Sequence, residues 1–189
     1  MRIAAGKFAR RVLAVPDGFS TRPTAMRTRE AIFNILQHHE WGRPVPAGCT
    51  VLDACSGTGA MAFEALSRGA VRAWLMEKER SALQIARRNI GILGVQTSCS
   101  LIAGDAAHPP PAPKPCDLIF CDPPYRKALP EKIIPALLAA GWFAPYAVLV
   151  LETALGETVR LPPQLILMQQ RDYGVATVRF FVHRPPLKK

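Results

Sequence analysis

Residues 51–59 read Val-Leu-Asp-Ala-Cys-Ser-Gly-Thr-Gly, and this stretch decides the fold. It starts as a short apolar strand over 50–54 and ends in two glycines, directly before an apolar helical pattern over 60–68. Glycine at such a turn lets the backbone come close to a ligand, and open α/β sheets bind ligands outside the carboxyl ends of their strands. We therefore predict a binding site at the end of this first strand.

Strand and helix patterns alternate along the chain from this loop onward. Such alternation is typical of an α/β protein that has a mostly parallel sheet with helices on both faces. We predict further strands over 73–77, 101–103, 117–121 and 147–152, and helices over 80–93 and 129–140. Pro135 should kink or split the last of these helices. Residues 165–169 and 175–182 predict an antiparallel hairpin at the edge of the sheet.

The segment before the alternation has a different pattern. Residues 1–15 alternate loosely and predict a short strand, a turn and a second strand. A helical pattern covers 25–38, and a linker rich in proline and glycine follows over 42–48. We therefore expect a small N-terminal β-hairpin and helix, residues 1–43, ahead of a main domain formed by residues 44–189.

The net charge of +10 is concentrated at the N-terminus. Residues 1–29 contain one acid, Asp17, and seven basic side chains: Arg2, Lys7, Arg10, Arg11, Arg22, Arg27 and Arg29. A basic arm of this kind suits a polyanion such as nucleic acid, although a solvated basic surface is also common.

Composition excludes several other classes of protein. A chain of 189 residues can bury a core without disulfides, and its five cysteines have neither an even count nor the spacing of a zinc site. No apolar run is long enough for a signal peptide or a membrane span. We expect a cytoplasmic protein with reduced cysteines, no metal and no membrane partner.

Three acids follow three successive predicted strands. Asp53 precedes the glycine loop, where a carboxylate would repel a pyrophosphate but would suit the cationic amino group of a methionine moiety. Glu77 can accept from ribose hydroxyls, and Asp105 can accept from an adenine amino group. Together they predict a site for S-adenosyl-L-methionine. The alternative is that Glu77 and Asp105 only cap a helix and a loop.

A nicotinamide dehydrogenase shares part of this pattern. The spacing Gly57-x-Gly59-x-x-Ala62 fits the dinucleotide fingerprint, and Glu77 lies where its ribose-binding acid is expected. That class of enzyme accounts neither for Asp53 nor for the basic arm. It also leaves unexplained the motif that follows the fourth strand.

This motif is Asp122-Pro123-Pro124-Tyr125. An exocyclic amine on a base is a poor nucleophile, because its lone pair is delocalised into the ring. The Asp122 carboxylate and the Pro123 carbonyl can each accept an amino hydrogen, and the prolines hold the turn rigid. Tyr125 offers a ring face on which an extruded base can stack. The motif predicts methyl transfer to a base amine without a metal or a covalent intermediate.

The two motifs together resemble the amino-methyltransferases that act on adenine N6, cytosine N4 or guanine N2. Segments 2–8, 21–24, 27–34 and 64–70, with the hairpin at Tyr173-Gly174, narrow this resemblance. They are similar to the bacterial 16S ribosomal RNA guanine-N2 methyltransferase family (RsmD type). Two residues depart from its pattern: Ala5 stands where a second glycine is usual, and Arg10 stands where a glycine commonly precedes the basic residue.

The resemblance implies a Rossmann-like, seven-stranded methyltransferase fold that uses S-adenosyl-L-methionine and releases S-adenosylhomocysteine. It implies guanine 966 of 16S ribosomal RNA, in a precursor of the small ribosomal subunit, as the acceptor. The residues expected at the cofactor are Asp53, Cys55, Ser56, Gly57, Thr58, Gly59, Glu77, Lys78, Asp105 and Ala106. Those expected at the base are Asp122, Pro123, Pro124 and Tyr125. Those expected at the RNA are Arg2, Lys7, Arg10, Arg11, Arg22 and Arg27.

Two rival functions stay open at this point. A DNA adenine-N6 or cytosine-N4 methyltransferase would need a recognition domain, for which 189 residues leave little room. A non-catalytic RNA-binding module would not need the complete acceptor motif. Nothing in the sequence demands a dimer, and we expect a monomer.

Overall fold

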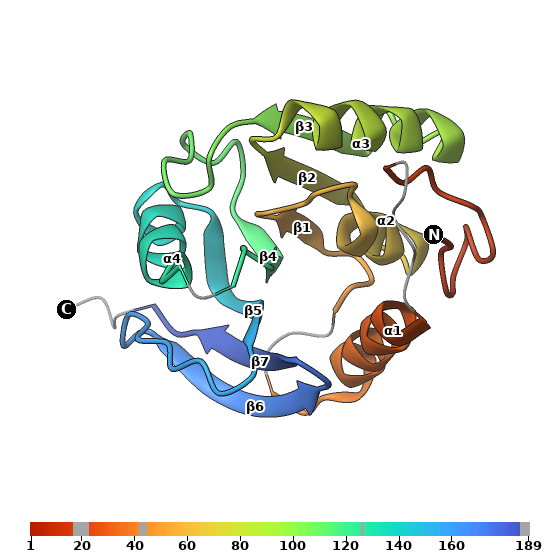
Figure 1. Ribbon diagram of the computed structural model, residues 1–189. Helices are drawn as coiled ribbons and strands as arrows, with labels where there is room; N and C mark the ends of the chain where they lie inside the picture. Colours follow the sequence, from red (N-terminus) through yellow and green to blue (C-terminus); the bar gives the residue numbers. More distant parts are fainter. Residues whose placement is uncertain (17–22, 42–44, 126, 186–189) are drawn as a thin grey trace.

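The computed structural model describes residues 1–16, 23–41, 45–125 and 127–185 (Figure 1). Seven strands form one sheet in the order β3-β2-β1-β4-β5-β7-β6. The strands are β1 (Thr50–Asp53), β2 (Arg72–Glu77), β3 (Cys99–Ala103), β4 (Cys116–Cys121), β5 (Phe143–Ala154), β6 (Leu165–Tyr173) and β7 (Ala176–His183). The helices are α1 (Pro23–His38), α2 (Ala60–Ser67), α3 (Arg80–Leu93) and α4 (Pro130–Ala139). The predicted architecture is confirmed.

The direction in which the chain builds the sheet reverses at β1. Strands β2 and β3 are added on one side of β1, and β4 and β5 on the other, all parallel. Strands β7 and β6 then close the edge as the predicted antiparallel hairpin. The carboxyl ends of β1 and β4 therefore meet at a topological switch point, where sheets of this kind bind their ligands.

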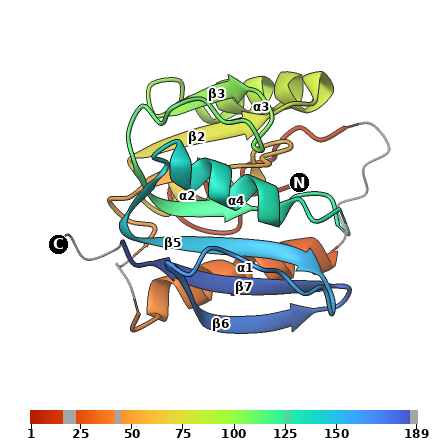
Figure 2. The ribbon, with the colours of Figure 1, turned by 90° about the vertical axis from the view of Figure 1, so that its left-hand side faces the viewer.

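Helices cover both faces of the sheet, and successive strand residues point to opposite faces. Figure 1 shows α4 on one side of the strands and α1 and α2 on the other, and Figure 2 looks onto α4. Leu118 and Phe120 pack in the same cluster as residues of α1, α2 and α3, whereas Ile119 and Cys121 pack with α4. This period of two is the pattern of a strand buried on both faces.

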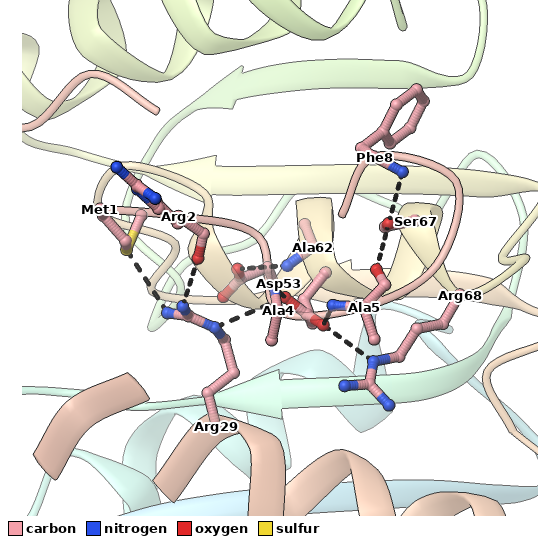
Figure 3. A network of polar contacts seen from close by, with 11 residues as sticks. Met1, Arg2, Ala4, Ala5, Phe8, Arg29, Asp53, Ala62, Ser67 and Arg68 are labelled. Carbon is pink, nitrogen blue, oxygen red and sulfur yellow. Dashed lines mark hydrogen bonds and ion pairs between the residues drawn. The ribbon is translucent and has the colours of Figure 1, made fainter. Parts of the chain in front are cut away.

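The N-terminal segment folds back on itself as its alternation predicted, but residues 1–16 form no regular strands. Backbone hydrogen bonds join Leu13 to Met1 at 2.8 Å, and Ile3 to Arg10 and Arg11 at 2.9 and 3.0 Å. Its backbone makes only one isolated antiparallel bridge, Arg2 to Val12, among the residues described here. The amide groups of Ala4 and Ala5 donate instead to the Glu64 carboxylate at 2.8 and 3.1 Å. Figure 3 shows this segment lying along α2. The hairpin is therefore short, because side chains of α2 accept amide hydrogens that a longer strand ladder would use.

The backbone conformation of Arg10 shows why a glycine is usual at this position in the family pattern. Its φ angle is 67°, in the left-handed region that favours glycine. The expected glycine would therefore suit this turn, and arginine is tolerated there at a cost of about 1 kcal/mol.

Two further expectations change in detail. Pro135 lies inside α4, which runs unbroken from Pro130 to Ala139, so the predicted split does not occur. Proline has no amide hydrogen, so α4 loses only the one backbone hydrogen bond that this residue would donate one turn back. The helix is short, and the packing of Ile133, Ile134 and Leu137 stabilises it. Strand β5 is twelve residues long rather than six, because it pairs with β4 from Phe143 and with β7 as far as Ala154.

Candidate active site

A pocket of about 500 Å³ lies at the carboxyl ends of β1, β2, β3 and β4. This volume is in the range of small-molecule sites. Ten of the residues predicted for the cofactor or the base line it: Cys55, Gly57, Glu77, Lys78, Asp105, Ala106, Asp122, Pro123, Pro124 and Tyr125. Four strand ends that are far apart in the sequence thus contribute to one cavity.

Asp53 lies beneath the pocket rather than in its wall. It is 3% exposed, and its carboxylate accepts the amide hydrogen of Ala62 in the first turn of α2 at 3.2 Å. The first amides of a helix lack partners within the helix, so this bond stabilises the start of α2. Burial raises the pKa of Asp53 to about 7, since desolvation disfavours the charged form. A direct contact between Asp53 and a methyl donor stays a prediction.

Glu77 holds the shape of the glycine loop. One carboxylate oxygen accepts the Gly57 amide hydrogen at 2.8 Å, and the other accepts the amide hydrogens of Lys78 and Glu79, both at 2.8 Å. Glu77 therefore ties the loop after β1 to the turn after β2. It caps that turn and also lines the pocket, so the capping role and the expected ribose contact are compatible.

Asp105 lines the pocket just after β3, the strand that pairs with β2. Its Oδ1 accepts the amide hydrogen of Ala107 at 2.9 Å, which is the loop-capping role considered as an alternative. Its Oδ2 lies 3.9 Å from Nζ of Lys78, and both side chains are exposed. This surface ion pair is weak, and it leaves the carboxylate accessible to a ligand.

The remaining loop residues act through the backbone. The Ser56 amide donates to Met76 at 3.0 Å, and the Gly59 amide donates back to Ser56 at 2.7 Å. The carbonyl of Thr58 accepts from the side chain of Asn89 at 3.1 Å. Ser56, Thr58 and Gly59 do not line the pocket, and they shape the turn that does.

Gly59 and Gly57 provide a test of this turn. Both have positive φ angles, 88° and 52°. A Cβ on Gly59 would collide with the buried side chains of Phe63 and Leu75, whereas a Cβ on Gly57 would meet open space. We expect Gly59→Ala to lower the free energy of unfolding by about 2–3 kcal/mol, and Gly57→Ala by about 1 kcal/mol. Urea unfolding measures both, and equal losses would contradict this account.

Asp122 lines the pocket and is exposed there. Its pKa is raised to about 8, first by loss of solvation and then by the negative charges of Glu152 and Asp53. Pro123 beside it is buried, and Pro124 is exposed. The acceptor motif therefore presents a carboxylate on a rigid support, and loss of solvation makes this carboxylate costly to ionise.

Tyr125 is held by a residue that sequence reasoning missed. Its hydroxyl donates to Oε1 of Glu152, on β5, at 2.6 Å. The ring is 38% exposed and lines the pocket. Desolvation and the hydrogen bond to Glu152 raise the pKa of Tyr125 well above its usual value. Glu152 ends the strand predicted over 147–152, so the rule that singled out Asp53 and Glu77 could have identified it.

The basic residues predicted to contact RNA are exposed wherever the structure describes them: Arg2, Lys7, Arg10, Arg11 and Arg27. Arg22 lies outside the described residues. Hydrogen bonds between Ile3 and the backbone of Arg10 and Arg11, at 2.9 and 3.0 Å, bring Arg2 alongside these two residues. Arg29 differs from the rest of the arm, because it is 6% exposed and lies 3.7 Å from Glu64.

Two other kinds of site are not found in the described parts of the chain. No group of three histidine, cysteine or acidic side chains is arranged there to hold a metal ion. None of the helices described has the length and hydropathy needed to cross a bilayer.

Known proteins resemble this chain over almost its full length. Residues 1–182 match the family model described as Conserved hypothetical protein 95. Ribosomal RNA small subunit methyltransferase D of Escherichia coli strain K12 is 34% identical over 182 residues, which cover 96% of this chain and 89% of that protein. The solved structure of yhhF from Escherichia coli superposes with a TM-score of 0.85 and 31% identity, over 97% of this chain and 98% of that one.

A more distant structure supports the fold alone. It is an RNA methyltransferase from Salinibacter ruber in complex with S-adenosyl-L-homocysteine. Its TM-score is 0.62 at 15% identity, and the match covers 90% of this chain and 97% of that one. The Rossmann-like, seven-stranded sheet with an antiparallel edge is common to both proteins.

Proposed function

This chain belongs to the family of ribosomal RNA small subunit methyltransferase D, and from this premise we propose its substrate and its chemistry. It transfers a methyl group from S-adenosyl-L-methionine to the exocyclic N2 of a guanine in 16S ribosomal RNA. The acceptor is guanine 966 of the assembling small ribosomal subunit. Such a substrate agrees with the cytoplasmic location expected from the sequence.

One observation carries the proposal: a single pocket has the two acids suited to a nucleoside and the acceptor motif in its wall. Glu77 and Asp105 lie on β2 and after β3, and Asp122 to Tyr125 follow β4. A donor held by the first pair would leave its reactive end toward the second group. A dinucleotide site would have no use for the rigid Asp-Pro-Pro-Tyr turn.

The residues of the pocket fit S-adenosyl-L-methionine. Gly57 has open space where a side chain would project, so the loop can lie close to a bound molecule. Glu77 and Asp105 supply carboxylate acceptors for ribose hydroxyls and an adenine amine. When bound, the donor supplies an electrophilic methyl group on a sulfonium and leaves as S-adenosylhomocysteine.

The acceptor residues position a weak nucleophile. Asp122 and the carbonyl of Pro123 accept the two hydrogens of the amine, which directs its lone pair toward the methyl group. Tyr125 stacks on the base, and Glu152 fixes the tilt of the Tyr125 ring through the hydroxyl. The amine becomes acidic once methylated, and its proton leaves to Asp122 or to water. The chemistry uses neither a metal nor a covalent intermediate.

Nucleoside mass spectrometry tests the proposal directly. The protein is incubated with isotopically methyl-labelled S-adenosyl-L-methionine and unmodified 16S RNA, either naked or in partly assembled particles, with DNA as the control. Labelled N2-methylguanosine is expected in RNA alone. Label on adenine or cytosine, or label confined to DNA, would overturn the ribosomal guanine assignment.

The basic arm gives a second test. We expect Arg10→Glu combined with Arg11→Glu to weaken RNA binding about tenfold at low salt, because both side chains are exposed. The slope of log affinity against log salt should flatten by about 1–2, since fewer counterions are released. Titration of fluorescent RNA at several salt concentrations measures both quantities.

A matched double variant controls for total charge. Lys114 and Lys132 are also exposed, but they lie before β4 and on α4, away from the arm. Lys114→Glu with Lys132→Glu should leave the salt slope nearly unchanged. If the two double variants weaken binding equally, the arm is not the RNA surface.

A further inference from the structure

Glu152 stands beside the acceptor motif because of strand register. Strands β4 and β5 are parallel, and Cys121 pairs with Leu151. The next residue along each strand is Asp122 and Glu152 respectively. Neighbouring strands lie about 5 Å apart, so these two carboxylate-bearing residues are neighbours at the same sheet edge. The negative charge of Glu152 is also the second cause of the raised pKa of Asp122.

Tyr125 links Glu152 to the place where a base would stack. The hydroxyl at the rim of the Tyr125 ring donates to Oε1 of Glu152. A base stacked on this ring and extending past its hydroxyl would bring its edge toward Glu152, the register neighbour of Asp122. The site thus offers two adjacent carboxylates to one edge of the base.

The nucleic-acid bases differ in the hydrogen-bond donors and acceptors that they present to such a pair of carboxylates. In guanine, the N2 amine is next to N1–H, so two neighbouring groups donate hydrogens. In adenine and cytosine, the amine is next to a ring nitrogen that accepts hydrogens. A carboxylate facing that nitrogen would be repelled and left without a partner, which is the strongest basis for rejecting an analogue.

We propose that Glu152 is the residue that selects guanine, by accepting N1–H while Asp122 accepts a hydrogen of the neighbouring N2 amine. This inference rests on the proposed function and deepens it, because it names the group that restricts the acceptor base. It also gives the two adjacent acids a purpose. A base edge with two donors gives each acid a hydrogen to accept, whereas an edge with one donor and one acceptor leaves Glu152 facing an acceptor.

The experiment compares guanine with 2-aminopurine, which keeps the 2-amino group but has a hydrogen acceptor at N1. Synthetic 16S RNA is prepared with either base at the methylated position, and kcat/KM is measured for each. The wild-type protein should prefer guanine by about a hundredfold or more. In Glu152→Gln, this preference should fall at least about tenfold, because the amide can donate to N1 of 2-aminopurine.

Tyr125→Phe distinguishes a Glu152 that selects the base from a Glu152 that only holds the Tyr125 ring in place. It removes the hydrogen bond to Glu152 but keeps the ring and the carboxylate. Both bases should react more slowly in this variant, with their ratio close to the wild-type value. A residue that only supports Tyr125 would likewise slow both bases equally when replaced. If Glu152→Gln keeps the wild-type ratio of kcat/KM for guanine over 2-aminopurine, Glu152 does not select the base. The proposed function would still stand in that case, provided that the wild type methylates guanine.

Other outcomes would affect the wider proposal. Transfer by the wild type to adenine or cytosine, or no transfer to any of these RNAs, would overturn both the role of Glu152 and the proposed guanine acceptor. Equal rates on guanine and 2-aminopurine in the wild type would show that N1–H is not recognised, and would likewise overturn the role of Glu152.

Discussion

Replacing Asp122 with asparagine is expected to lower methyl transfer by at least about a hundredfold, because a carboxylate that accepts from the amine becomes a neutral amide. The affinity for S-adenosyl-L-methionine should stay within about threefold of the wild-type value, since Glu77 and Asp105 are unchanged. Calorimetry measures the affinity, and single-turnover transfer to RNA measures the rate. Loss of donor binding in this variant would contradict the assignment of Asp122 to the base.

Asp105→Asn provides the contrasting variant. Asp105 lines the same pocket but follows β3, where we expect the adenine end of the donor. This change should weaken donor affinity, and turnover should recover at saturating donor. The opposite behaviour of the two variants would separate the acceptor end of the pocket from the cofactor end.

The same Asp122 variant has a predicted effect on stability. The pKa of Asp122 is about 8 in the folded protein, against an ordinary value of 3.8 for this side chain. The folded protein therefore retains a proton that the unfolded chain releases, and stability present below about pH 4 is lost as the pH rises toward 8. Solvent in the pocket screens much of this effect, so we expect about 1 kcal/mol. Asp122→Asn should then melt about 2–4 °C above the wild type at pH 8, and by less at pH 5.

Replacing Glu64 with alanine is expected to lower the free energy of unfolding by about 3–5 kcal/mol, the cost of breaking a buried ion pair. The Glu64 side chain is fully buried. It accepts from Ala4, Ala5 and Nε of Arg68, the last at 2.8 Å, and it faces Nε of Arg29 at 3.7 Å. Its removal leaves Arg29 as an unpaired buried charge and leaves the two amide groups without acceptors.

Urea unfolding measures this loss, and Glu131→Ala is the matched control. Glu131 is exposed and accepts one backbone amide hydrogen, that of Arg160 at 2.9 Å. Its replacement should cost no more than about 1 kcal/mol. Limited proteolysis should also detect early cleavage near residues 4–11 in Glu64→Ala, because Figure 3 shows this segment held along α2. A loss below about 1 kcal/mol for Glu64→Ala would mean that the network does not anchor the arm.

Much of the fold could be predicted from local patterns. The strand and helix alternation from Thr50 onward and the edge hairpin were confirmed, since each depends on a short period of apolar residues. The N-terminal hairpin is present over residues 1–13 but has no regular strands, because the amide groups of Ala4 and Ala5 bond to Glu64, some sixty residues away. No local pattern reports such a partner. Element ends also shifted, because the length of β5 depends on its pairing with both β4 and β7.

Ten residues of the predicted site line one pocket, while their roles stay predictions, and the residues that were missed had visible signals. Glu152 ends a predicted strand, as Glu77 does. Arg29 was counted with the basic arm, yet it shares a helix face with Ile32, Phe33 and Leu36, at spacings of three, four and seven. A basic residue in such an apolar stripe favours a buried ion pair over an RNA contact.

The sequence by itself determined which elements form and which chemical groups follow the strands, because both depend on neighbouring residues. It therefore determined the glycine loop, the acids at the strand ends and the Asp-Pro-Pro-Tyr turn. Only the tertiary structure decided which of these groups are neighbours. Asp122 meets Glu152 through the register of two strands, and Arg29 meets Glu64 through the packing of α1 on α2. Such pairings depend on the free energy of packing the whole chain, to which distant residues contribute as much as near ones.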